Sequence, residues 1–277
     1  MRAFSRLLLL CLFPLYAHAA GEADQGKSIG DLQWHAGPGA DAIAAKATLN
    51  VPADVMFIDE ANSKQFLQMT GNIPDPGNFI VFSKKDKWWA TFSFDPIGYV
   101  KDDEKIDADN ILQKMKDNDG PANEERRKLG FGELHTDGWY VPPHYDSATK
   151  RLEWGLKLHG DKDVTLNYTI RLLGRTGVMD ATLVSSPETL DADVRSFKEV
   201  LKGFDFNSGE RYAEFRAGDH VAEIGLGALV LGGAAAVAAK KGFFGAILAF
   251  LAAAWKVIAV AVVGVLAKIR SLFSKKE

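Results

Sequence analysis

The stretch TLNYTIRLL-GRTG-VMDATLV, residues 165–184, decides the fold of this chain. In its first half, apolar or aromatic residues alternate strictly with polar ones, which is the period of a strand that has one face on a core and one facing water. The tetrapeptide at 174–177, with glycine at both ends, joins this run to a second apolar run as a hairpin. We therefore expect an antiparallel sheet.

Two further runs, 88–94 and 152–158, show the same alternation, and residues 146–150 read as a turn between strands. Together these signals predict one α+β domain with an antiparallel sheet of about six strands and helices packed on it. The closing order of hairpin, helix and short Phe204–Phe206 strand is similar to the ending of PsbP-like sandwiches.

Two helices are expected among the strands. The first starts near Ile106, breaks at Gly120-Pro121 and stops before Gly130. The second has a capping-box pattern, Ser185 with Glu188, and ends at Gly203. Its predicted buried stripe, at helical spacing, is Leu190, Val194, Phe197 and Leu201.

The N-terminus reads as a secretory signal, residues 1–19, with a basic start, a short apolar run and cleavage between Ala19 and Ala20. Cleavage would remove Cys11, the single cysteine, and with it any disulfide, thiolate ligand or cysteine nucleophile. Residues 20–40 are rich in glycine and aspartate and read as a linker, so the extracytoplasmic domain is expected at 41–219.

The C-terminal stretch 221–267 is apolar and reads as a membrane segment of one or two helices, followed by a basic tail, 268–277. Two spans would turn at Lys240-Lys241, whereas Lys256 inside the second costs about 2.5 to 3.5 kcal/mol on insertion scales. The alternative is one long span ending in the cytoplasm, with the first stretch in the interface. Ala228, Gly232 and Ala236 at spacing four would let this Gly/Ala-rich helix pack on a protein partner or a second copy.

Charge divides the chain in the same way. The whole chain has a net charge of −3, but its two ends are basic, so the central domain is strongly acidic. An acidic domain beside a basic membrane tail argues against nucleic acid as a partner. The expected location is the bacterial inner membrane, with the lipid bilayer as one partner and the domain in the periplasm.

The acidic run 101–109 lacks the glycine and the distal glutamate of a calcium loop, so we expect Asp107 or Asp109 to cap a helix instead. No histidines stand in HExxH or HxH spacing. His135 and His144 could converge with a carboxylate such as Asp137 or Asp146 as a zinc or acid–base site, but scattered surface histidines are commoner. We therefore predict no metal, no cofactor and no catalytic residue.

Residues 138–146 combine aromatic rings with Pro142-Pro143. Rigid, partly exposed rings of this kind can bind a peptide or a sugar face. The other interpretation is an edge strand that ends at the prolines, with Trp139 and Tyr145 in the core.

Five blocks in order give the chain a family resemblance: 98–107, 123–126, 138–146, 166–178 and 209–215. This series resembles the bacterial membrane-anchored family known as domain of unknown function 2167. The resemblance implies a secreted domain with a membrane anchor and implies no activity. Phe131 stands where the family pattern has tyrosine.

The blocks and the unusual residues supply the candidate binding residues: Asp102, Asp103, Trp139, Tyr145, Arg171 and Arg175. Arg171 shares a strand face with Asn167, so we expect it to be buried and paired with a carboxylate, from Asp102 or Asp103. The predicted function is a membrane-anchored envelope domain that binds or scaffolds a protein or an envelope polymer, rather than an enzyme. The alternative is an envelope hydrolase that uses carboxylates and histidines.

Overall fold

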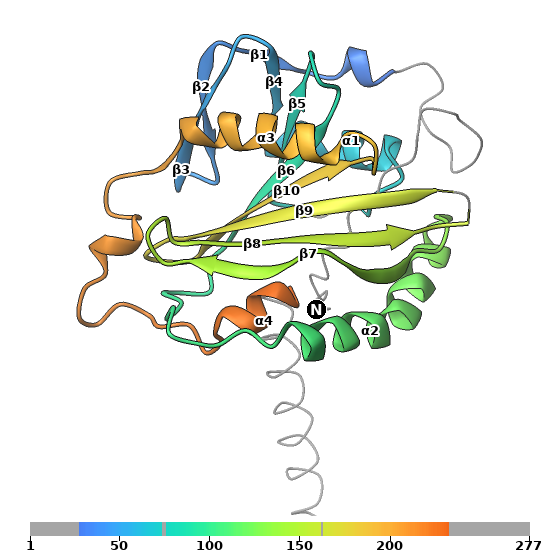
Figure 1. Cartoon of the computed structure of the whole chain (residues 1–277). Coiled ribbons are helices and arrows are strands. Elements are labelled where there is room, and N and C mark those ends of the chain that lie inside the picture. The colour runs from blue at the N-terminus through green and yellow to red at the C-terminus, as the bar shows by residue number, and fades with distance from the viewer. Residues whose placement is uncertain (1–27, 74–75, 162, 233–277) are drawn as a thin grey trace, which may run out of the picture.

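The computed structural model describes residues 28–232, except 74–75 and 162 (Figure 1). The predicted signal, its cleavage site at Ala19 and Ala20, and the membrane segment and basic tail from residue 233 on lie outside the described residues. Among the described residues, no helix is both long enough and apolar enough to cross a bilayer.

The chain forms a large antiparallel sheet and a small one. The large sheet has eight strands in the order β1-β4-β5-β6-β10-β9-β8-β7, and the small one has three in the order β11-β3-β2. The α+β class is thus confirmed, whereas the expected six strands are too few, because short N-terminal strands carry little alternation. The strands are β1 (His35–Ala36), β2 (Gly39–Ile43), β3 (Ala47–Val51), β4 (Val55–Ile58), β5 (Asn78–Ser83), β6 (Trp89–Asp95), β7 (His135–Asp146), β8 (Arg151–His159), β9 (Val164–Leu173), β10 (Val178–Ser185) and β11 (Phe204–Phe206).

The helices cover both faces of the large sheet. They are η1 (Ile29–Asp31), α1 (Glu60–Met69), α2 (Ala108–Lys128), α3 (Leu190–Val200), η2 (Leu201–Gly203), η3 (Tyr212–Glu214) and α4 (Leu226–Val230). The small sheet and α3 pack on one face, while α1, α2 and α4 pack on the other. In Figure 1, α3 crosses in front of the sheet above β9, and α2 and α4 lie together below β7.

The deciding hairpin is β9 and β10, with Val178 opposite Leu173 as the turn predicts. Leu166, Tyr168, Ile170 and Leu172 enter the main core, which they share with α3 and the small sheet. Their neighbours Asn167, Thr169 and Arg171 face the opposite side and are also buried. The polar half of the alternation therefore lies inside the protein, where Thr169 bonds Thr182 of β10 at 2.9 Å.

The first predicted helix does not break. Instead, α2 runs through Pro121 as one element and ends before Gly130, as expected. Side chains on both sides of the proline fasten the helix to the start of β7: Asp119 accepts from the backbone and hydroxyl of Thr136, and Asn123 makes two bonds to the Leu134 backbone. These tertiary contacts offset the hydrogen bond that proline removes.

The second helix starts later than its capping pattern indicated. Because β10 continues to Ser185, α3 begins at Leu190, and Glu188 lies before it. The hydroxyls of Ser185 and Thr189 both donate to Asp193, at 2.6 and 2.7 Å. The predicted stripe is confirmed: Leu190, Phe197 and Leu201 are buried and Val194 packs against the same core.

Two sequence boundaries differ from the described structure. The expected linker, residues 20–40, contains η1, β1 and the start of β2. At the other end, Ile224 and Leu226 of the expected membrane segment are buried against the domain, together with Leu229 and Val230 of α4. The described fold thus extends on both sides of 41–219.

Candidate functional site

Two of the predicted binding residues meet in one cluster. The Oδ2 atom of Asp102, in the loop between β6 and α2, accepts from the Tyr145 hydroxyl of β7 at 2.7 Å and from Lys150 Nζ at 2.8 Å. Lys150 Nζ lies 5.0 Å from the centre of the Tyr212 ring. Tyr99 stacks on Tyr212 and contacts Phe215, with ring centres 4.3 Å apart in both cases. We call Tyr99, Asp102, Tyr145, Lys150, Tyr212 and Phe215 the Asp102 cluster.

Lys150 occupies a backbone conformation that normally selects glycine. Its φ is +56°, at the end of the turn from β7 to β8. An L-residue there costs roughly 1 to 2 kcal/mol relative to a relaxed backbone. The contacts of its ammonium with Asp102 and Tyr212 offset that cost, and they are absent if glycine takes the place. The turn thus presents a cation rather than only reversing the chain.

The electrostatics keep Asp102 ionised and keep Tyr145 and Tyr212 neutral at neutral pH. The hydrogen bond from Lys150 holds the pKa of Asp102 below its ordinary value. Burial, followed by the bond to Asp102, raises the pKa of Tyr145, and burial also raises the pKa of Tyr212. Because an ionised carboxylate and two neutral phenols are poor proton shuttles near pH 7, the cluster is suited to binding rather than to acid–base catalysis.

The cluster lies beside the segment that leads into the apolar C-terminal stretch. Tyr99 donates its backbone N–H to His220 and accepts from Ala222, both at 2.8 Å. The Tyr212 hydroxyl donates to the Val100 carbonyl at 2.9 Å. Glu104, two residues after Asp102, accepts from the Gly227 N–H at 3.2 Å. Residues 207–232 are therefore fastened to the end of the large sheet, and we call them the docked segment.

Arg175 belongs to the same end of the molecule but binds a different carboxylate. Its Nε and Nη2 donate to the two oxygens of Asp219, each at 2.7 Å, and its Nη1 donates to the Gly209 carbonyl at 3.2 Å. The Arg175 hydrogen bonds lower the pKa of Asp219 to about 2. Sequence reasoning named the arginine and missed its partner, which lies 44 residues away.

Arg171 is buried and paired with carboxylates, but not with those that we expected. Its Nη1 lies 3.3 Å from Asp95 and its Nη2 lies 2.9 Å from Asp180, on the two strands beyond it in the sheet. Asp102 and Asp103 belong to the loop after β6, where Asp102 accepts from Tyr145 and Lys150 instead. Burial raises the pKa of Asp180, while its other oxygen accepts from Thr182 at 2.9 Å. Arg171 thus holds three central strands together from inside.

The remaining two candidates have separate surroundings. Trp139 is partly buried in the core that β8 shares with α2 and α4, and its Nε1 donates to the Ala108 carbonyl at 3.1 Å. Asp103 is exposed. The edge-strand interpretation of 138–146 holds for Trp139 and Tyr145, which both pack on that core. The strand does not end at the prolines, however, because β7 lies at the sheet edge, where proline is tolerated, and its register shifts around them.

Convergence of His144, Asp146, Asp102 and Arg171 in one pocket would favour the hydrolase alternative. In the structure, each of these side chains binds a different partner. Asp146 accepts from Ala148 and Thr149 within its own turn, and Arg171 is buried elsewhere. His144 Nε2 lies 3.9 Å from Glu153 Oε2, which already accepts from Tyr168 and Lys198. His135 lies opposite His159, far along β7 from His144.

The acidic run also has a structural outcome. The sequence predicts that Asp107 or Asp109 caps the helix. Asp107 does so, because it accepts from the Asn110 N–H at 3.0 Å at the start of α2. Within the described ranges, no group of three or more His, Cys, Asp or Glu side chains has the geometry to hold a metal ion.

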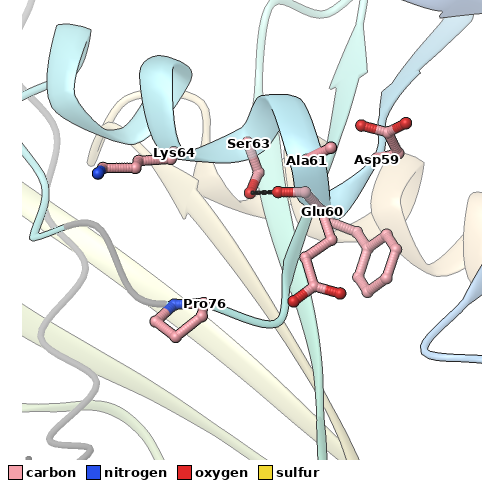
Figure 2. A pocket seen from close by; sticks show the side chains of 7 residues that line it. Asp59, Glu60, Ala61, Ser63, Lys64 and Pro76 are labelled. Atoms are coloured by element: carbon pink, nitrogen blue, oxygen red, sulfur yellow. Dashed lines mark hydrogen bonds between the residues drawn. The ribbon is translucent and has the colours of Figure 1, made fainter.

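A surface cavity of about 700 Å³ lies elsewhere, beside the first turn of α1 (Figure 2). Figure 2 shows Glu60 directed toward Pro76, with Lys64 on the same helix. The described residues that line this cavity are Asp59, Glu60, Ala61, Ser63, Lys64, Pro76 and Phe79. None of the candidate binding residues lines it.

Comparison with known proteins identifies the family. A family model described as "Protein of unknown function (DUF2167)" matches residues 35–266. Comparison with curated proteins gives no significant match. The solution structure of cyanobacterial PsbP (CyanoP) from Synechocystis sp. PCC 6803 is similar over 69% of this chain and 98% of that chain, at 12% identity and a TM-score of 0.35. That TM-score supports no conclusion, so the PsbP-like ending stays a prediction. The family match covers most of the chain, and the protein belongs to the DUF2167 family of proteins of unknown function.

Proposed function

We propose that the protein is a domain anchored in the bacterial inner membrane and facing the periplasm, where it binds or scaffolds a protein or an envelope polymer. The observation that carries the proposal is the Asp102 cluster. It joins one end of the large sheet to the docked segment, which leads into the apolar stretch. A domain fastened in this way would stand at a fixed orientation to its anchor.

The buried residues of the docked segment favour one membrane span over two. Ile224, Leu226, Leu229 and Val230 are all buried against the domain. A first span at 224–239 would have to withdraw them, and it is already shorter than the roughly 20 residues that a bilayer needs. A single span after residue 241 would leave the basic tail in the cytoplasm, in agreement with the positive-inside tendency.

The charge states in the cluster favour binding over hydrolysis. Asp102 is ionised and Tyr145 and Tyr212 are neutral at neutral pH, so the cluster offers hydrogen bonds and ring surfaces to a partner. Exposed Asp103 and the 39% exposed Phe215 lie beside these groups. The hydrolase alternative could use His144 near Glu153, but that carboxylate already accepts from Tyr168 and Lys198.

Membrane anchorage and topology can be tested with cysteines, because the predicted mature chain contains none. Ser147→Cys, in the exposed β7–β8 turn, should react with an impermeant thiol reagent in intact spheroplasts. Labelling that requires lysis would overturn the periplasmic assignment. The full chain should stay in the membrane fraction after an alkaline carbonate wash, whereas a chain truncated after Gly232 should be released. Equal membrane retention of the two chains would refute the anchor.

Partner binding needs a separate experiment. A photo-crosslinking residue at exposed Asp103 should give a discrete adduct in cells, whereas the same residue at exposed Asp161, at the other end of β8, should not. Phe215→Ala should diminish the Asp103 adduct. Equal crosslinking from both positions, or none from Asp103, would contradict a binding surface at the Asp102 cluster.

A further inference from the structure

Two histidines that sequence spacing did not connect form a pair at the far end of β7. His135 and His159 are directly opposite in the β7–β8 register. Their ring centres are 5.2 Å apart, with an angle of 27° between the ring planes. Each side chain is 45% exposed, so both rings are open to solvent.

Each imidazole has a carboxylate at one ring nitrogen. His159 Nδ1 lies 2.5 Å from Asp137 Oδ1, and His135 Nε2 lies 3.4 Å from Glu133 Oε2. The His159 contact is a hydrogen bond, and because an ionised carboxylate only accepts, Nδ1 of His159 carries the proton. In the neutral imidazole Nε2 of His159 then has a free lone pair. In His135, Nδ1 is the ring nitrogen that does not face Glu133.

This arrangement matches the surroundings of metal-binding histidines. Such a histidine normally donates its second N–H to a carboxylate, which fixes the tautomer and the ring orientation. Asp137 accepts from His159 in that way, and Lys157 Nζ, 3.7 Å from Asp137, balances its charge. Glu133 lies near the corresponding nitrogen of His135, at 3.4 Å. Directly opposed residues of antiparallel strands have Cβ atoms about 4.5 to 5.5 Å apart, which lets two imidazoles reach one ion when the rings turn.

We propose that His135 and His159 bind a divalent transition-metal ion, with Nδ1 and Nε2 as the respective ligands and with Glu133 and Asp137 as supports. Imidazole ligands suit Cu²⁺, Ni²⁺ and Zn²⁺, and exclude Mg²⁺ and Ca²⁺ as competitors. The site uses two protein ligands, and water completes the coordination. It is therefore consistent with the absence of three-ligand groups from the described residues. The proposal does not depend on membrane anchorage or on a partner at the Asp102 cluster.

The test is metal titration of the full chain, purified in detergent with a tag that lacks histidine. Calorimetry should give one Cu²⁺ per chain, with weaker binding of Ni²⁺ and Zn²⁺ and none of Mg²⁺. The electron paramagnetic resonance spectrum of the copper complex should show coupling to two nitrogen nuclei. His135→Ala and His159→Ala should each weaken Cu²⁺ binding by more than about tenfold, and Asp137→Asn by roughly 10- to 100-fold. His144→Ala and His35→Ala, which remove other exposed histidines, should leave it unchanged.

Absence of saturable Cu²⁺ binding would overturn the proposal, as would binding that survives both His135→Ala and His159→Ala. Coupling to a single nitrogen would refute the paired site. Thermal melting without metal should be the same for wild type and variants, because both side chains are half exposed. If an alanine variant melts early, the glutamine variants His135→Gln and His159→Gln replace it. Copper should raise the melting temperature of the wild type and not that of either variant.

Discussion

The Tyr145 hydroxyl donates to Asp102 Oδ2 at 2.7 Å, across 43 residues of sequence. This bond joins β7 to the loop that follows β6. β7 is one edge strand of the large sheet, and β1 is the other. Lys150 donates to the same oxygen at 2.8 Å, so one carboxylate oxygen fixes a strand, a turn and a loop. The position of the docked segment depends on this convergence, because its Tyr212 and Phe215 rest on the same group of rings.

Asp102→Asn should lower stability at pH 7 by about 1.5 to 3 kcal/mol, the range for hydrogen bonds to a charged group. The pKa of Asp102 is lowered in the folded protein, so its contribution is present above the unfolded-state value near 3.8 and is lost as the pH falls through the folded value. The variant should therefore resemble the wild type at low pH. Denaturant unfolding at pH 7 and below pH 3.8 measures this, and exposed Asp103→Asn is the matched control.

Lys150 allows backbone strain and side-chain contact to be separated. Lys150→Gly removes the ammonium but relaxes the positive φ, whereas Lys150→Ala removes the ammonium and keeps the strain. The alanine variant should be less stable than the glycine variant by roughly 1 kcal/mol. Equal stabilities of the two variants in urea melts would mean that the backbone at this turn is not strained. An alanine variant as stable as the wild type would mean that the Asp102 contact contributes nothing.

The sequence predicts that Arg171 is buried and paired with a carboxylate, but it does not predict which carboxylates those are. Alternation along 165–173 placed Arg171 on one strand face, and burial of an arginine requires a carboxylate. The choice of Asp95 and Asp180 follows from the strand order β6-β10-β9, which no local pattern specifies. For the same reason, the hairpin and the stripe of α3 could be read from the sequence, whereas the meeting of Asp102, Lys150 and Tyr212 could not. The β7–β8 register likewise created the His135–His159 pair.

Arg171→Ala should lower the free energy of unfolding by about 3 to 5 kcal/mol, because it leaves Asp95 and Asp180 without the guanidinium in a buried site.

Asp180→Asn should lower the free energy of unfolding at pH 7 by less than Arg171→Ala does. Burial raises the pKa of Asp180 above its unfolded value, so ionisation of this carboxyl opposes folding as the pH rises through that interval. The variant should therefore gain stability relative to the wild type as the pH rises above 3.8, the ordinary pKa of this carboxyl. Unfolding curves of Asp180→Asn and the wild type, measured from about pH 4 upward, test this expectation. An Arg171→Ala protein of unchanged stability would contradict the structural role of the arginine.

The docking of residues 207–232 can be tested at Gly98, beside Tyr99. Gly98 has φ +95°, and an added Cβ would lie 2.6 Å from the His220 carbonyl oxygen, which accepts the Tyr99 N–H. Gly77 is the matched control, because its φ is +88° and an added Cβ would meet nothing within 4 Å. Both alanine variants carry the same backbone strain, so only Gly98→Ala should release the docked segment. Limited trypsin digestion should cut faster after the exposed Arg216 in Gly98→Ala than in Gly77→Ala. Equal cleavage rates in the two variants would show that the hydrogen bonds of Tyr99 to His220 and Ala222 do not hold the segment in place.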